Sequence, residues 1–91
     1  MNKQVSTELV KARETIANNL RKILSEKYDE NPKNIFLHPT DLTRISWENS
    51  ILSFLESENP DSFNKIINDA CKGTGYNIEL YNPVEGLIFK E

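Results

Sequence analysis

The sequence predicts an α+β fold, and four local patterns indicate it. An uninterrupted amphipathic stripe covers about residues 5–28, and a short apolar segment follows at 35–38. Two further helical segments meet at an Asn-Pro pair, and apolar residues then alternate around a loop over 76–90. A chain of 91 residues has the length of a single domain, here 1–91. The resulting order, α-β-α-α-β-β with a C-terminal hairpin on a small antiparallel sheet, is that of a winged-helix domain.

The first helix is expected to be long. Its apolar residues recur at spacings of three and four, without Pro or Gly: Val5, Leu9, Ala12, Ile16, Leu20, Ile23, Leu24 and Tyr28. A helix of about 23 residues measures roughly 35 Å, whereas a compact chain of this size has a radius of gyration of about 12 Å. We therefore expect the helix to span the domain or to project beyond it. In the second case the uncovered stripe near Val5 and Leu9 predicts a homodimer.

The segment 35–38 is the best candidate for a third strand, because a hairpin of two strands is marginally stable in water. Asn31 and Pro32 precede it, and Pro39 follows it. A buried loop crossing is the alternative for the same four residues.

A second helical region is predicted over about residues 41–57. Thr40 or Asp41 could cap a short turn, and Ser46 could cap a helix that begins at Trp47. Four apolar residues lie nearly all round this helix: Ile51, Leu52, Phe54 and Leu55. A helix of this kind is usually buried, so we expect it at the centre of the domain.

The third helix, about residues 60–72, has the clearest boundaries. Asn59 suits the N-cap, Pro60 the first helical position, and Gly73 the position just past the end. Its buried stripe is predicted to comprise Phe63, Ile66, Ile67, Ala70 and Cys71.

The loop of the C-terminal hairpin, residues 76–90, predicts the register of its strands. Pro83 suits the first loop position and Gly86 a position with positive φ, which gives a loop of four residues, 83–86. The expected pairs are then Asn82 with Leu87, Tyr81 with Ile88, Leu80 with Phe89, and Glu79 with Lys90. One apolar face would contain Tyr76, Ile78, Leu80, Leu87 and Phe89.

Composition argues against several kinds of site. One cysteine excludes an intramolecular disulfide, and one cysteine with one histidine excludes the usual zinc ligand sets. No acid, base or nucleophile has the spacing of a catalytic motif, so we expect a protein that is not an enzyme and needs no cofactor. The first residues lack the apolar core of a signal peptide, and no apolar run approaches the roughly 18 residues of a membrane span. We therefore expect a cytoplasmic protein that does not enter a membrane.

Three details invite a functional interpretation, but each has a simpler structural one. The segment 72–75, Lys-Gly-Thr-Gly, resembles part of a phosphate loop, yet it follows a helix C-terminus, where the dipole repels anions. Cys71 lies on the predicted buried stripe and is interpreted as a small core residue. His38 has only Asp41 as a nearby acid and is interpreted as structural.

The uneven charge of the chain favours a protein partner over DNA. Residues 1–27 carry a net charge of +3 and residues 28–91 a net charge of −6. A DNA-reading winged domain would use its third helix and its hairpin, and the acidic residues there oppose a phosphate backbone. They are Glu56, Glu58, Asp61 and Glu85. Four polar residues on the third helix suit either base recognition or a solvated face: Asn64, Lys65, Asn68 and Lys72.

The sequence thus predicts a small acidic interaction domain that inhibits or adapts a larger macromolecule, as accessory proteins of phages and mobile elements do. A winged-helix transcriptional regulator that binds DNA is the alternative. Trp47 either fills the core or anchors a partner. The candidate partner-binding residues are Trp47, Asn64, Lys65, Asn68, Lys72, Tyr81 and Ile88.

Overall fold

The computed structural model describes residues 7–82 and 86–90, with side chains over residues 7–78. In chain order its elements are α1 (Thr7–Tyr28), the 3-10 helix η1 (Pro32–Asn34), β1 (Ile35–Leu37), β2 (Arg44–Trp47), α2 (Ile51–Glu58), α3 (Pro60–Cys71), β3 (Asn77–Asn82) and β4 (Gly86–Lys90). The chain is therefore mixed α+β, as predicted. The described strands form one antiparallel sheet in the order β1-β2-β4-β3.

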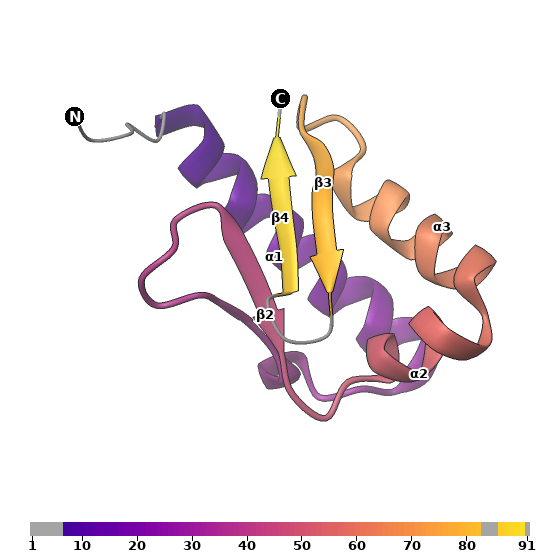
Figure 1. Ribbon diagram of the computed structural model, residues 1–91. Helices are drawn as coiled ribbons and strands as arrows, with labels where there is room; N and C mark the ends of the chain where they lie inside the picture. Colours follow the sequence, from indigo (N-terminus) through magenta and orange to yellow (C-terminus); the bar gives the residue numbers. More distant parts are fainter. Residues whose placement is uncertain (1–6, 83–85, 91) are drawn as a thin grey trace.

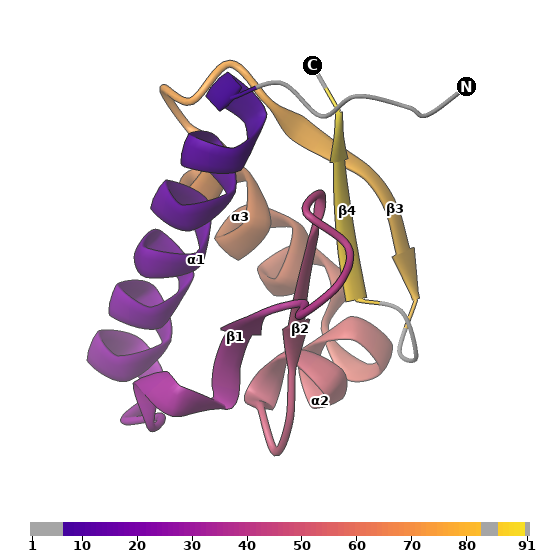
Figure 2. The same cartoon turned by 90° about the vertical axis from the view of Figure 1, so that its left-hand side faces the viewer.

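The elements form two layers (Figures 1 and 2). Helices α1 and α3 lie side by side and cover one face of the sheet, while α2 lies at one end of the molecule. The 22 residues of α1 correspond to about 33 Å of helix. Because the longest dimension of the molecule is 41 Å, α1 spans the domain along its length.

The predicted stripe of α1 is largely confirmed. Its residues Ala12, Ile16, Leu20 and Leu24 are buried and Ile23 is half-buried, and the helix also buries Ala17, which lies outside the predicted stripe. Leu9 is half-buried and packs against this core, so at Leu9 the stripe is covered in part by the chain itself. Val5, the other residue of the homodimer argument, lies outside the described residues, and a homodimer stays a prediction. Tyr28, by contrast, is exposed.

The boundaries of α3 are confirmed by their local chemistry. The Asn59 side chain accepts a hydrogen bond from the Ser62 amide at 3.3 Å, and Pro60 opens the helix. Gly73, two residues after the last helical residue, has a φ of +82°, a conformation that suits glycine. All five residues of the predicted stripe are buried.

The prediction of a helix over 41–57 is wrong before residue 51. Residues 44–47 form β2, where Ile45 is fully buried, and the N-cap of α2 is Ser50, not Ser46. The element order is therefore α-β-β-α-α-β-β, with one strand more than expected. The tertiary reason is pairing on both sides: β2 lies between β1 and β4, which satisfies its backbone groups as a central strand. The candidate strand at 35–38 exists as β1, and it pairs with β2 rather than with the hairpin.

The predicted hairpin register is also wrong. Gly86 pairs with Asn82, so Gly86 belongs to β4 and the connection is one residue shorter than expected. Leu80 consequently pairs with Ile88, and Tyr81 with Leu87. The register shifts again between Ile78 and Leu80, where Glu79 is the extra residue of a β-bulge. Three residues of the predicted apolar face, Leu80, Leu87 and Phe89, have side chains that lie outside the described ones.

Candidate functional site

The most prominent surface feature is a pair of exposed aromatic side chains. Phe54 on α2 is 59% exposed, and Tyr28 at the end of α1 is 38% exposed. Both line a surface hollow of about 590 Å³, together with half-buried Ile51. We call this region the Tyr28–Phe54 surface; its residues are Tyr28, Asp29, Glu30, Asn31, Asn34, Asn49, Ser50, Ile51 and Phe54.

Phe54 is exposed because α2 is short and lies at the edge of the domain, so the prediction that α2 would be central is wrong. Leu52 and Leu55 are buried and define the inner side of the helix. Successive helical residues are rotated by about 100°, so Phe54 lies about 200° from Leu52 and about 100° from Leu55. A helix with one buried side must therefore leave this aromatic ring in solvent.

Tyr28 is held in place by a tight end to α1. Asp29 adopts the left-handed conformation, with a φ of +55°, and turns the chain away from the helix. The Glu30 amide then donates to the Leu24 carbonyl at 3.3 Å, which ties the turn back to the last part of α1. Position 29 therefore suits Asp or Asn, the residues other than glycine that tolerate this conformation best.

Glu30 joins the end of α1 to the start of α2. Its carboxylate accepts hydrogen bonds from the Ser50 hydroxyl at 2.8 Å and from the Ile51 amide at 2.6 Å. The Ser50 oxygen in turn accepts a bond from the Leu52 amide at 3.1 Å. A carboxylate at a helix N-terminus is stabilised by the unpaired amides and by the helix dipole. This contact fixes α2, and with it Phe54, relative to Tyr28.

A second bridge joins two other residues of the lining, Asn34 and Asn49. Asn34 Nδ2 donates to the Asn49 carbonyl at 2.9 Å, and the Glu48 amide donates to the Asn34 carbonyl at 2.9 Å. Asn31 caps η1 by accepting a bond from the Lys33 amide at 2.9 Å. Hydrogen bonds between segments 15 to 21 positions apart thus hold the lining of the surface together.

Four of the sequence-predicted partner residues lie on α3 and at its C-cap, Lys72. Asn64, Lys65, Asn68 and Lys72 are all exposed, as expected. The exposed charges of this face balance, because Asp61 and Asp69 accompany the two lysines, and Lys65 forms an ion pair with Asp69 at 3.5 Å.

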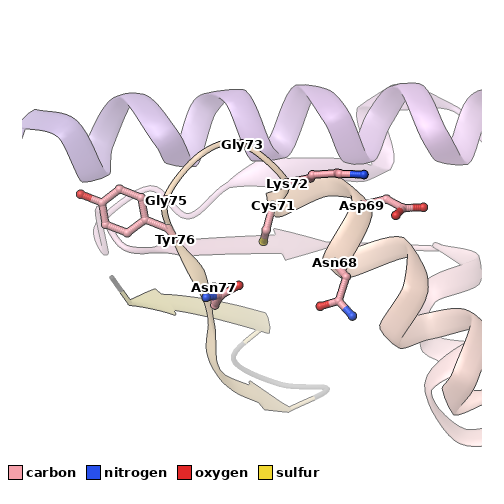
Figure 3. A pocket seen from close by; sticks show the side chains of 8 residues that line it. All are labelled: Asn68, Asp69, Cys71, Lys72, Gly73, Gly75, Tyr76 and Asn77. Carbon is pink, nitrogen blue, oxygen red and sulfur yellow. The ribbon is translucent and has the colours of Figure 1, made fainter.

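Asn68 and Lys72 also line a pocket of about 550 Å³ where α3 turns into β3 (Figure 3). Cys71 points its sulfur into this region, whereas the Lys72 side chain extends beside α1. Thr74 closes the turn, since its hydroxyl donates to the Cys71 carbonyl at 2.6 Å. The segment 72–75 therefore terminates a helix, in agreement with its structural interpretation.

The other three predicted partner residues belong to strands of the sheet. Trp47 ends β2 instead of starting a helix, packs partly against the core and donates from Nε1 to the Ser53 hydroxyl at 3.0 Å. Tyr81 and Ile88 were predicted to face each other, but the register pairs them with Leu87 and Leu80. The side chains of Tyr81 and Ile88 lie outside the described ones.

The remaining candidate chemistry is structural. Cys71 is 5% exposed, and burial raises the pKa of its thiol to about 11. His38 Nδ1 accepts hydrogen bonds from the amides of Thr40 at 3.2 Å and Asp41 at 3.0 Å, which shapes the loop between β1 and β2. Among residues 7–78 no three His, Cys, Asp or Glu side chains gather as metal ligands would. No described helix is long and apolar enough to cross a membrane.

The exposed surface of α1 is less basic than the sequence of the helix. Arg13 is 5% exposed, and its Nη1 donates to the carbonyls of His38, Asp41 and Arg44. Arg21 Nε donates to the Ile35 carbonyl at 3.0 Å. Both guanidinium groups therefore hold α1 against the backbone of other segments of the domain. Over the described part of α1, the exposed lysines and glutamates are equal in number: Lys11, Lys22 and Lys27 against Glu8, Glu14 and Glu26.

Sequence reasoning missed the Tyr28–Phe54 surface. It assigned Tyr28 to the buried stripe and Phe54 to a central helix. One signal was available: four apolar residues within five positions of a short helix cannot all face one core.

Comparison with known proteins adds no assignment, since no protein-family model, no curated protein and no solved structure matches this chain.

Proposed function

We propose that this protein is a non-enzymatic interaction domain that binds another protein through the Tyr28–Phe54 surface and thereby inhibits or adapts it. The observation that carries the proposal is the 59% exposure of Phe54 beside the exposed ring of Tyr28 on one hollow. Aromatic side chains dominate the energetics of protein interfaces, and they bind best from pockets that exclude water.

The free energy of burying an aromatic side chain favours a partner for Tyr28 and Phe54. Removing a large apolar side chain from water stabilises a complex by about 1.5–3 kcal/mol. In the free protein Phe54 is 59% exposed, so somewhat more than half of this free energy is still available for binding. The hydrogen bonds of Glu30 limit the motion of α2 against α1, which lowers the entropy that binding would cost.

A winged-helix DNA-binding regulator is the second candidate. Its support is the connectivity: without β1, the chain reads α1-β2-α2-α3-β3-β4, with the strands side by side in the order β2-β4-β3. The exposed face of α3 would then read the duplex through Lys65, Asn68 and their neighbours. The balanced charge of that face argues for a protein partner instead, because phosphate contacts need an excess of cations.

Affinity capture of the tagged chain from its native cells, with both protein and nucleic acid quantified, separates the two candidates. We expect a protein partner whose recovery falls at least about tenfold with Phe54→Ser, because the interface would lose its largest anchor. Leu42→Ser is the matched control, since Leu42 is also an exposed apolar residue, at 45%, outside the Tyr28–Phe54 surface.

The opposite result would support the alternative. Recovery of specific DNA that is lost with Lys65→Ala and unaffected by Phe54→Ser would refute the proposed protein-binding function.

A further inference from the structure

We propose that the Tyr28–Phe54 surface recognises a basic, apolar-flanked segment of its partner and seats an arginine side chain in the hollow. This inference rests on the proposed function and specifies the chemistry of the partner. It follows from the charges, the aromatic rings and the hydrogen-bonding state of the described residues around the hollow.

The charges of the hollow favour a cationic ligand. The described lining of the hollow includes two carboxylates, Asp29 and Glu30, and no Lys, Arg or His. Lys27 and Lys33 are near in sequence and exposed, but neither is among the described lining residues. The hollow is therefore locally acidic and complements a cation.

The two carboxylates differ in their hydrogen bonding. Glu30 already accepts two short bonds at the start of α2, so most of its role is structural. Asp29 is exposed, and its carboxylate forms no hydrogen bond or ion pair within residues 7–78. Its left-handed backbone holds it at the rim between α1 and η1. A free carboxylate at a fixed position suits the bidentate geometry of a guanidinium group.

The aromatic rings of Tyr28 and Phe54 also favour a cation. Cations bind over the faces of Tyr and Phe rings, and arginine does so more often than lysine because its planar group also stacks. Tyr28 and Phe54 supply two such rings, and Ile51 supplies an apolar floor for the aliphatic part of the side chain. An acidic partner would face Asp29 and Glu30 without compensation, which disfavours it.

Selection of displayed random peptides on the intact chain tests this inference. We expect the selected peptides to be enriched in arginine next to apolar residues. Their binding should weaken at least about tenfold with Phe54→Ser and about threefold or more with Asp29→Asn, which keeps a residue that tolerates the left-handed backbone. Leu42→Ser and Asp61→Asn are the controls, because each removes an exposed group of the same kind outside the hollow.

The outcomes separate the two proposals. Selected peptides that are neutral or acidic, but still depend on Phe54, would overturn the basic partner and leave the proposed function standing. Basic peptides that bind Asp29→Asn and Asp61→Asn equally well would overturn the arginine site. Failure to select any peptide that depends on Phe54 would overturn both the surface and the inference. Circular dichroism of each variant establishes that the exposed-site changes leave the fold intact.

Discussion

Replacing Arg13 by methionine tests whether a buried cation stabilises this fold. Arg13 ties α1 to the loop between β1 and β2, since Nη1 lies 2.9 Å from the Asp41 carbonyl and 3.2 Å from the Arg44 carbonyl. Hydrogen bonds from a charged donor contribute about 1.5–3 kcal/mol each. Against this gain, Nε of Arg13 is buried without a hydrogen-bond partner, which costs about 1–3 kcal/mol and would be relieved by methionine.

We therefore expect Arg13→Met to lower the free energy of unfolding by about 2–3 kcal/mol, and the melting temperature by about 10–20 °C. Urea titration followed by circular dichroism measures the first quantity. Hydrogen exchange should also show faster opening of residues 38–44. Lys11→Met, at an exposed position of the same helix, should change stability by less than about 0.5 kcal/mol. An Arg13→Met protein as stable as the wild type would mean that desolvation of the guanidinium fully offsets its bonds, and the reasoning would fail.

Two further predictions concern titratable groups. The pKa of Asp41 is lowered from 3.8, chiefly by the hydrogen bond from the Thr43 hydroxyl, so its ionised form stabilises the folded state. Asp41→Asn should therefore be less stable than the wild type at neutral pH, and the difference should shrink as the pH falls from about 5 to 3; a constant difference in acid titrations would contradict this. Cys71, the only cysteine, should react with iodoacetamide at pH 8 at least about a hundredfold more slowly in the folded than in the urea-unfolded chain, because burial raises its thiol pKa from 9.0 to about 11. Equal alkylation rates by mass spectrometry would show that the thiol is accessible.

Local interactions explain what could be predicted for α1 and α3. Asn59 and Pro60 begin α3 through contacts within its first turn, and Gly73 takes the left-handed conformation just past its end. These interactions join residues close in sequence, so the pattern alone carries the information. The stripe of α1 was predictable for the same reason, because its periodicity records which side faces a core.

The candidate site could not be predicted in this way. Tyr28 continues the spacing of the buried stripe. It is exposed because the core ends before this last residue of α1. Phe54 has the same apolar character as Leu52 and Leu55, and the packing of α2 on α3 decides which of them is buried. Glu30 reaches Ile51 across 21 positions, a contact that no local pattern reveals.

The sequence by itself thus determined the α+β class, the long first helix and the ends of α3, all of which depend on short-range hydrogen bonds and on periodic burial. Only the tertiary structure decided that residues 44–47 form a strand, that Gly86 enters the hairpin ladder and that Phe54 faces solvent. The physical reason is that strand pairing and burial depend on partners distant in the chain. A segment such as Arg44–Trp47 becomes a strand because β1 and β4 bind it on both sides.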